Sequence, residues 1–133
     1  MQISPDLKDF DFFGKQKREA FYSSKTAISN LIKARDSWSL RDEAKIQGLL
    51  KISLWGNKCD LSISAGTSQS FHHDPLAQIE NFKDNLLVDD SLSVVNLFTK
   101  EQILDIIMDN AGFEMLSDFC LADYLTSSGI VNK

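Results

Sequence analysis

One short stretch constrains the fold of this chain more than any other, an isoleucine-rich run that ends in an acid and an amide. Residues Ile103–Leu116 read ILDIIMDNAGFEML. The part from Ile103 to Met108 has the length of a strand and is continuous rather than alternating, which is typical of a central strand covered on both faces. After Gly112, apolar residues return at helical spacing as far as Leu125. The pattern predicts a strand, a tight turn and a helix.

The end of the sequence fits the same interpretation. It closes with SSGIVNK, a turn signal followed by what would be the start of a second strand. Because a parallel βαβ unit needs both of its strands, we expect an α/β fold in which this chain is part of a larger protein. A mainly helical region, residues 1–101, would lead into residues 102–133, the first strand-helix unit of a truncated, doubly wound parallel sheet.

Three segments before this unit show the apolar period of amphipathic helices. The first is Ser23–Arg35, whose initial serines suit a helix start. The second is Arg41–Leu54, which we expect to end at Trp55–Asn57 because glycine and asparagine readily adopt the left-handed conformation of helix ends. The third is Ser91–Phe98, and capping explains the two aspartates that precede it. These helices would make up much of residues 1–101.

The histidines and cysteines indicate no site. His72 and His73 lie in a polar stretch near residues 65–75 that is typical of a flexible surface loop. Adjacent histidines cannot share one face of a regular element, so we expect them to be solvated. Cys59 and Cys120 lack a C-x-x-C or histidine partner at ligand spacing. This predicts two reduced thiols that are buried or nearly so.

Composition argues against several classes of function. With 133 residues, of which 43% are hydrophobic, the chain has ample material for one folded core. The net charge of -5 gives no general attraction to nucleic acid or anionic lipid. No apolar stretch approaches the ~20 residues of a bilayer span, and the N-terminus lacks the pattern of a secretion signal. We expect a soluble cytoplasmic protein, with the nucleus as a second compartment, that binds neither nucleic acid nor membrane.

Asp109 and Asn110 would lie where open parallel sheets bind their ligands. That place is the crevice beyond the carboxyl ends of the strands, beside the N-terminus of the following helix. A carboxylate and an amide carbonyl are hard oxygen ligands suited to Mg²⁺ or Mn²⁺, and such an ion can polarise a phosphate. Gly112 would let the backbone approach a ligand closely.

A purely structural interpretation accounts for the same residues. Asp109 or Asn110 would cap the helix, Gly112 would relieve the turn, and Glu114 would interact favourably with the helix dipole. A metal site needs a third ligand, and no other acid of the chain is an obvious candidate. The corner by itself leaves both interpretations open.

Two stretches, taken together, resemble a known family. They are ISLWGNKCDLSIS, residues Ile52–Ser64, and DNAGFEMLSDFCLADYL, residues Asp109–Leu125. Their order and separation resemble the damage-control phosphatase family, metal-dependent sugar-phosphate phosphatases that are also described as acidic-residue methyltransferases. The stretch DFDFFGKQKREAFYSSKTAISNLI is similar to the helical region before the tryptophan motif of that family. The likeness covers nearly the whole chain, but only the middle of a full-length member.

The resemblance implies a divalent metal, Mn²⁺, Co²⁺, Mg²⁺ or Ni²⁺, held by Asp109, Asn110 and an aspartate of a later strand that has no counterpart here. Asp109 would be catalytic, and both residues would bind substrate. The tryptophan motif would lie near the pocket, which makes Asn57 and Asp60 candidate substrate-side residues; a helix end with local hydrogen bonds is the alternative. Glu114 matches the glutamate that is linked in the family with the proposed methyl-donor site.

The resemblance leads first to metal-dependent hydrolysis of sugar phosphates such as fructose phosphates, with this chain an incomplete and by itself inactive part of the enzyme. The expected partner is then a small phosphorylated metabolite. A second reading is protein carboxyl methylation with S-adenosylmethionine, although the sequence lacks a glycine-rich nucleotide loop. A third is a noncatalytic, truncated product that binds an unidentified protein through uncovered apolar surface.

Overall fold

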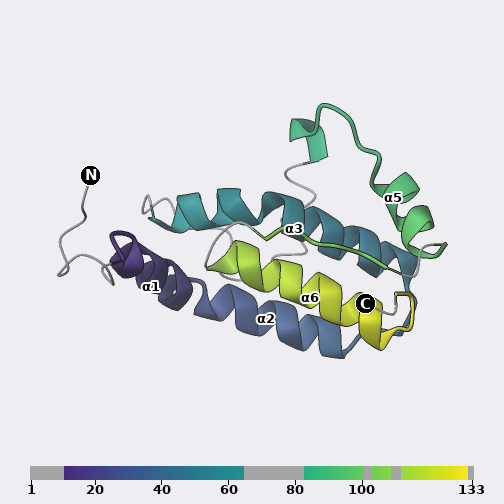
Figure 1. Ribbon diagram of the computed structural model, residues 1–133, viewed down its shortest axis with the longest axis horizontal. Helices are drawn as coiled ribbons and strands as arrows, with labels where there is room; N and C mark the ends of the chain where they lie inside the picture. The colour runs from purple at the N-terminus through teal and green to yellow at the C-terminus, as the bar shows by residue number, and fades with distance from the viewer. Residues whose placement is uncertain (1–10, 65–82, 101–102, 109–111, 132–133) are drawn as a thin grey trace, which may run out of the picture.

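The regular structure of the described chain is helical. The computed structural model describes residues 11–64, 83–100, 103–108 and 112–131, with the backbone alone at 57–64 and 83. No strand occurs in these ranges, so the predicted α/β fold with a parallel sheet is wrong. The elements are α1 (Gly14–Ser23), α2 (Lys25–Asp36), α3 (Glu43–Ser64), the short 3₁₀ helix η2 (Lys83–Asn85), α5 (Ser91–Phe98) and α6 (Phe113–Ser127) (Figure 1).

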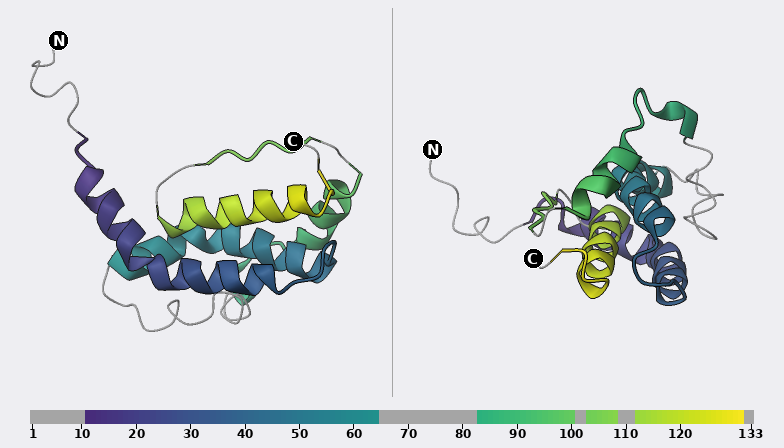
Figure 2. Two further views of the ribbon diagram at one scale, coloured as in Figure 1. Left: turned by 90° about the horizontal axis from the view of Figure 1, so that it is seen from below. Right: turned by 90° about the vertical axis from the view of Figure 1, so that its right-hand side faces the viewer.

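Helices α3 and α6 lie side by side and form the central pair of the fold (Figures 1 and 2). Helix α2 packs along α6, α5 packs on α3, and α1 contacts both α2 and α3. The facing apolar side chains form one core, and their removal from water is the main force that holds the helices together. Its buried members are Ala27, Leu31, Ile46, Leu49, Ile52, Val95, Phe98, Phe113, Leu121, Tyr124, Leu125 and Val131.

The predicted helix Ser23–Arg35 is confirmed as α2. Ala27 and Leu31, one turn apart, are buried against the core as the apolar period requires. Ser24 does not cap α2 with its side chain. Its hydroxyl donates a hydrogen bond to the carbonyl of Ala20 at 2.6 Å, so the serine joins α1 to α2.

The helices on either side of the isoleucine-rich run are also confirmed. Helix α5 spans the predicted residues, and the backbone N–H of Ser91 donates to the carboxylate of Asp89 at 3.1 Å. Asp90 makes no such capping bond. Helix α6 begins directly after Gly112, as predicted, and continues to Ser127. Local sequence signals were sufficient for both helices.

The predicted end of the second helix at Trp55–Asn57 is wrong, because α3 continues to Ser64. Gly56 has no positive φ; among the described residues only Arg41, Gly112 and Gly129 do. Gly56 is buried where α3 meets α6, and a Cβ at this position would lie 2.7 Å from the Cα of Glu114. The glycine therefore serves a close approach of two helices and not a helix end.

The predicted strand Ile103–Met108 forms no strand and no helix. Leu104 and Ile106 pack against the core, whereas Ile103 is 66% exposed and Ile107 is 97% exposed. The segment is covered on one side only, so the expectation of cover on both faces is wrong. A strand is stabilised by hydrogen bonds to a neighbour, and no described segment pairs with this one.

The second predicted strand, at the end of the sequence, is replaced by a helix cap. The backbone N–H groups of Ile130 and Val131 donate to the carbonyl of Leu125, at 3.0 and 3.4 Å. Gly129 has a φ of 62°, the left-handed conformation that commonly follows a helix. Val131 is buried, so the apolar pair that suggested a strand closes α6 instead.

Some predictions fall outside the described residues. These are the flexible loop near residues 65–75 and the solvated state of His72 and His73. No helix in the described ranges is both long and apolar enough to cross a membrane.

Candidate functional site

The two candidate metal ligands, Asp109 and Asn110, lie outside the described residues, and their role stays a prediction. The structure describes the chain again from Gly112 onward. Gly112 has φ 93° and ψ −148°, a conformation that is essentially restricted to glycine. Phe113 is only 1% exposed and anchors the first turn of α6 in the core. The start of α6 is thus fixed by a glycine turn and a buried ring.

The first two turns of α6 rest directly on α3. A Cβ at Gly56 would lie 3.0 Å from the Cβ of Glu114 and 3.1 Å from Oγ of Ser117. The Ser117 hydroxyl donates to the carbonyl of Glu114 at 2.7 Å. One turn of α3 earlier, the hydroxyl of Ser53 donates to the carboxylate of Asp118, which is 7% exposed. This seam of small and polar residues sets the position of the helix that follows the candidate ligands.

The seam was not predicted from the sequence. Sequence reasoning missed Ser53 and Asp118 as a buried hydrogen-bonded pair and misread Gly56. A signal exists on α6, where Glu114, Ser117 and Asp118 follow one another at helical spacing and therefore share a face. Burying a carboxylate requires a hydrogen-bonding partner, and only the fold shows that Ser53 provides one.

Asn57 and Asp60, the candidate substrate-side residues, lie within α3. Their spacing of three places them on the same side of that helix, one and four residues after Gly56. Their side chains are not described, so their role stays a prediction. The alternative, that they belong to a helix end, is wrong because α3 continues to Ser64.

Glu114 is half-buried in the first turn of α6. Its backbone faces Gly56 across the closest part of the seam, and a carboxylate at a helix N-terminus is favoured by the helix dipole. The link between Glu114 and a methyl donor stays a prediction.

The two cysteines are the other residues with reactive side chains. Cys120 is a free thiol, as predicted, and burial raises its pKa with a further contribution from the nearby carboxylate of Asp123. The side chain of Cys59 is not described. Among the residues that the structure describes, no group of three or more His, Cys, Asp or Glu side chains could hold a metal. A metal site must therefore include residues outside the described ranges.

Comparison with known proteins decides the family. Residues 2–133 match the Damage-control phosphatase ARMT1-like domain. The chain belongs to this family. The predicted family is confirmed, and both stretches that suggested it lie in the matched region of this ARMT1-like chain. Ile52–Ser64 lies in α3, and the described part of the second stretch forms the turn at Gly112 and most of α6.

Several curated ARMT1 proteins are similar to this chain. Damage-control phosphatase ARMT1 of Mus musculus is 38% identical over 146 residues, which cover 98% of this chain and 33% of the mouse protein. The Danio rerio protein of the same name is 34% identical over 151 residues, covering 100% of this chain and 34% of its own length. The Homo sapiens protein is 36% identical over 149 residues, with 98% and 33% covered. The chain spans about a third of the length of these relatives. No solved structure matches it.

Proposed function

We propose that the protein to which these residues belong is a metal-dependent phosphatase that hydrolyses sugar phosphates such as fructose phosphates. One observation carries this proposal: nearly the whole chain matches a damage-control phosphatase domain, and its relatives carry the name damage-control phosphatase. The contact between α3 and α6 supports it, because the helices that carry the two family-like stretches pack directly on each other.

The residues that would hold the metal fit such an ion. The carboxylate of Asp109 and the amide oxygen of Asn110 are hard donors that suit Mn²⁺, Co²⁺, Mg²⁺ or Ni²⁺. Gly112, with its φ of 93°, supplies the sharp turn between these donors and α6. A bound divalent ion would neutralise phosphate charge. The ion would also need further ligands.

The proposed roles of the side chains follow from their chemistry. Asp109 would hold the ion or attack the phosphorus atom as a nucleophile, and Asn110 would bind the ion and orient the substrate. Asn57 and Asp60 would contact the sugar through hydrogen bonds. The substrate would be a small phosphorylated metabolite, and the enzyme would be cytoplasmic, with the nucleus as a second compartment.

The test uses the full-length protein, with phosphate release from fructose 1-phosphate and fructose 6-phosphate measured in Mn²⁺. Asp109→Asn preserves size and removes the negative charge, so we expect activity to fall at least about 100-fold with the fold intact, as for loss of a major electrostatic group. Asp105→Asn is the matched control, because Asp105 is exposed on the same segment. Activity that survives in Asp109→Asn at the level of Asp105→Asn would refute the assignment.

A further inference from the structure

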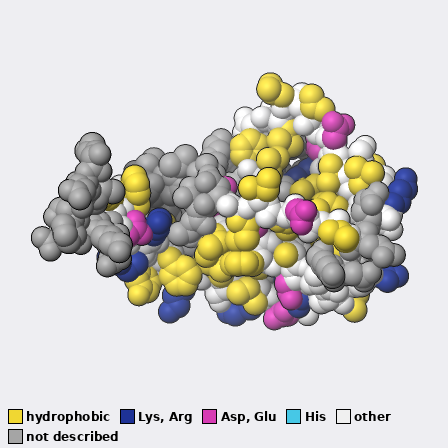
Figure 3. Space-filling model, viewed as in Figure 1, with side chains coloured by type: hydrophobic (Ala, Val, Ile, Leu, Met, Phe, Trp, Pro, Cys, Tyr) yellow, Lys and Arg dark blue, Asp and Glu magenta, His cyan; other side chains and the backbone are white. Residues whose placement is uncertain are grey.

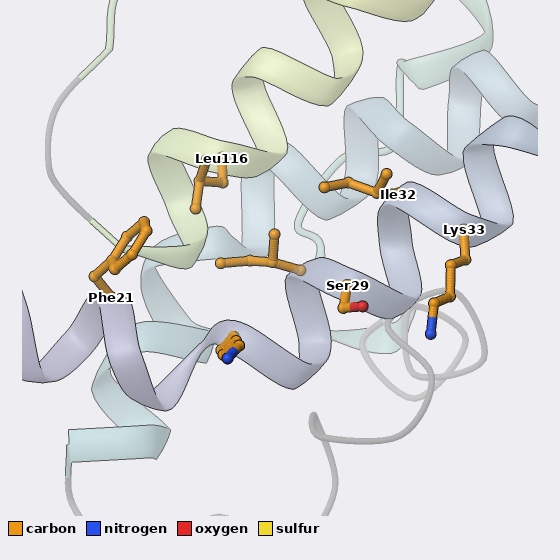
Figure 4. Close-up of a pocket in the computed structure, with 7 residues that line it drawn as sticks. Phe21, Ser29, Ile32, Lys33 and Leu116 are labelled. Carbon is orange, nitrogen blue, oxygen red and sulfur yellow. The ribbon is translucent and has the colours of Figure 1, made fainter.

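A groove opens between α1, α2 and α6. It encloses about 400 Å³ and is lined largely by apolar side chains (Figure 4). Phe21 comes from α1, Ile28 and Ile32 from α2, and Leu116 from α6. We call these residues, with Lys25 and Lys33, the basic groove.

The two charged residues that line the basic groove are both lysines. Lys25 and Lys33 line it from α2. They are eight residues apart, which is about 12 Å along the helix. Both are exposed, and neither belongs to the ion pairs found among the described residues. An apolar surface bordered by two ammonium groups fits a partner whose apolar surface is bordered by carboxylates.

The chain itself carries such a surface between η2 and α5. Leu87 is 102% exposed and Val88 is 72% exposed, so both side chains lie in water. Asp84 and Asp90 flank them, are exposed, and take part in none of the ion pairs between described residues. We call residues 84–90 the acidic knob. The acidic knob projects from the body of the molecule (Figure 1). Hydrophobic and acidic side chains gather on this projecting part (Figure 3).

The knob and the groove belong to different sides of the fold. The knob leads into α5, which packs on α3, whereas the groove is formed by α1, α2 and α6. Figure 1 shows α5 next to α3, and α2 beyond α6 on the opposite side of α3. The knob therefore lies too far round the fold to enter the groove of its own chain. A second copy of the chain offers a knob of complementary charge to that groove.

We propose that the acidic knob of one chain binds the basic groove of a second copy. Leu87 and Val88 would cover Ile28, Ile32 and Leu116, and Asp84 and Asp90 would pair with the two lysines. Such a contact is heterologous, since it joins different surfaces of the two copies. Its small area makes it weak, and its charges make it weaker in salt. The proposal is independent of the phosphatase assignment.

The experiment is sedimentation velocity of this chain from about 10 µM to about 1 mM, the range in which a contact of this size forms. A groove variant, Lys25→Glu with Lys33→Glu, and a knob variant, Asp84→Lys with Asp90→Lys, change only exposed residues. Each should self-associate at least about tenfold more weakly than the wild type. Mixed together they should associate again, because each then finds a surface of opposite charge.

Two further variants sharpen the test. Lys100→Glu changes an exposed lysine outside the groove and should leave association unchanged. Leu87→Ser removes the exposed apolar tip without touching the core and should weaken association. A wild-type chain that stays monomeric over the whole range overturns the proposal, as does a mixture of the charge variants that stays monomeric. Charge variants that associate like the wild type would place the contact elsewhere and also overturn it.

Discussion

Tyr124 shows how a single residue links distant parts of this chain. Its ring is buried and packs edge-on against Trp38, with centroids 5.8 Å apart. Its hydroxyl donates to the carbonyl of Ser39 at 2.5 Å and accepts from the backbone N–H of Asp42 at 3.2 Å. One phenol therefore ties α6 to the connection between α2 and α3.

Removing that hydroxyl should cost stability without changing the fold. Tyr124→Phe leaves two backbone groups without their partner, so we expect the free energy of unfolding to fall by about 1–2 kcal/mol. Urea unfolding followed by circular dichroism measures the change. Tyr22→Phe is the control, because Tyr22 is 71% exposed and should unfold like the wild type. Equal midpoints for the two variants would contradict this account.

Asp89 gives the chain a stabilising contact that depends on pH. Its carboxylate accepts a hydrogen bond from Lys51 at 2.7 Å and further bonds from the hydroxyl and backbone N–H of Ser91. These interactions, that of Lys51 first, lower the pKa of Asp89 from 3.8 to about 2. Because the pKa is lower in the folded chain, the contact stabilises the fold above about pH 4 and is lost as the pH falls toward 2.

The corresponding variant should reveal this dependence. Asp89→Asn should lower the midpoint of thermal unfolding at about pH 6, and the difference from the wild type should shrink steadily as the pH falls from about 4 to about 2. Lys51→Gln should give the same trend, because it removes the ammonium group that lowers the pKa. A difference that stays constant between these pH values would show that the ion pair does not contribute.

At the scale of the element, the contact between α3 and α6 depends on the absence of a side chain. Gly56→Ala would place a Cβ 2.7 Å from the Cα of Glu114, a backbone atom that cannot move alone. We expect α6 to shift and the free energy of unfolding to fall by about 1–3 kcal/mol, as in other overpacked cores. Thermal unfolding of the variant measures the loss.

A second helical glycine provides the matched control. At Gly14 a Cβ would meet the Asp11 side chain at 3.4 Å, an ordinary contact. Because alanine favours helix more than glycine does, Gly14→Ala should be neutral or stabilising by up to about 1 kcal/mol. Equal destabilisation by the two substitutions would mean that helix crossing is not the reason for glycine at 56.

The elements that the sequence predicted correctly are those with local causes. Helices α2, α5 and α6 follow from apolar residues at helical spacing and from the turn at Gly112. The end of α3 could not be predicted, because Gly56 contacts Glu114, a residue far along the chain. The strand at Ile103–Met108 was predicted from hydrophobicity alone, but a strand also needs a neighbouring strand. The hydrogen bond between Ser53 and Asp118 was also missed, because these two residues lie far apart in the sequence.

At the scale of the whole molecule, the core joins parts of the chain that the sequence analysis had separated. Residues of α2, α3 and α5 pack with residues of α6 in one cluster. The division into residues 1–101 and 102–133 stays a prediction. The family could be predicted because each of its two motif-like stretches is contiguous in sequence, whereas a metal site would depend on residues brought together by folding. The chain covers only about a third of its relatives.

The turn at Gly112 has a practical consequence for protein engineering. Its backbone angles exclude nearly every residue that carries a β-carbon. A library that randomises positions 109 to 114 should therefore recover glycine at 112 under any selection that demands a folded chain, whereas the neighbouring codons would respond to the activity that is selected. Position 112 thus works as an internal standard, against which tolerance of change at Asp109 and Asn110 can be calibrated.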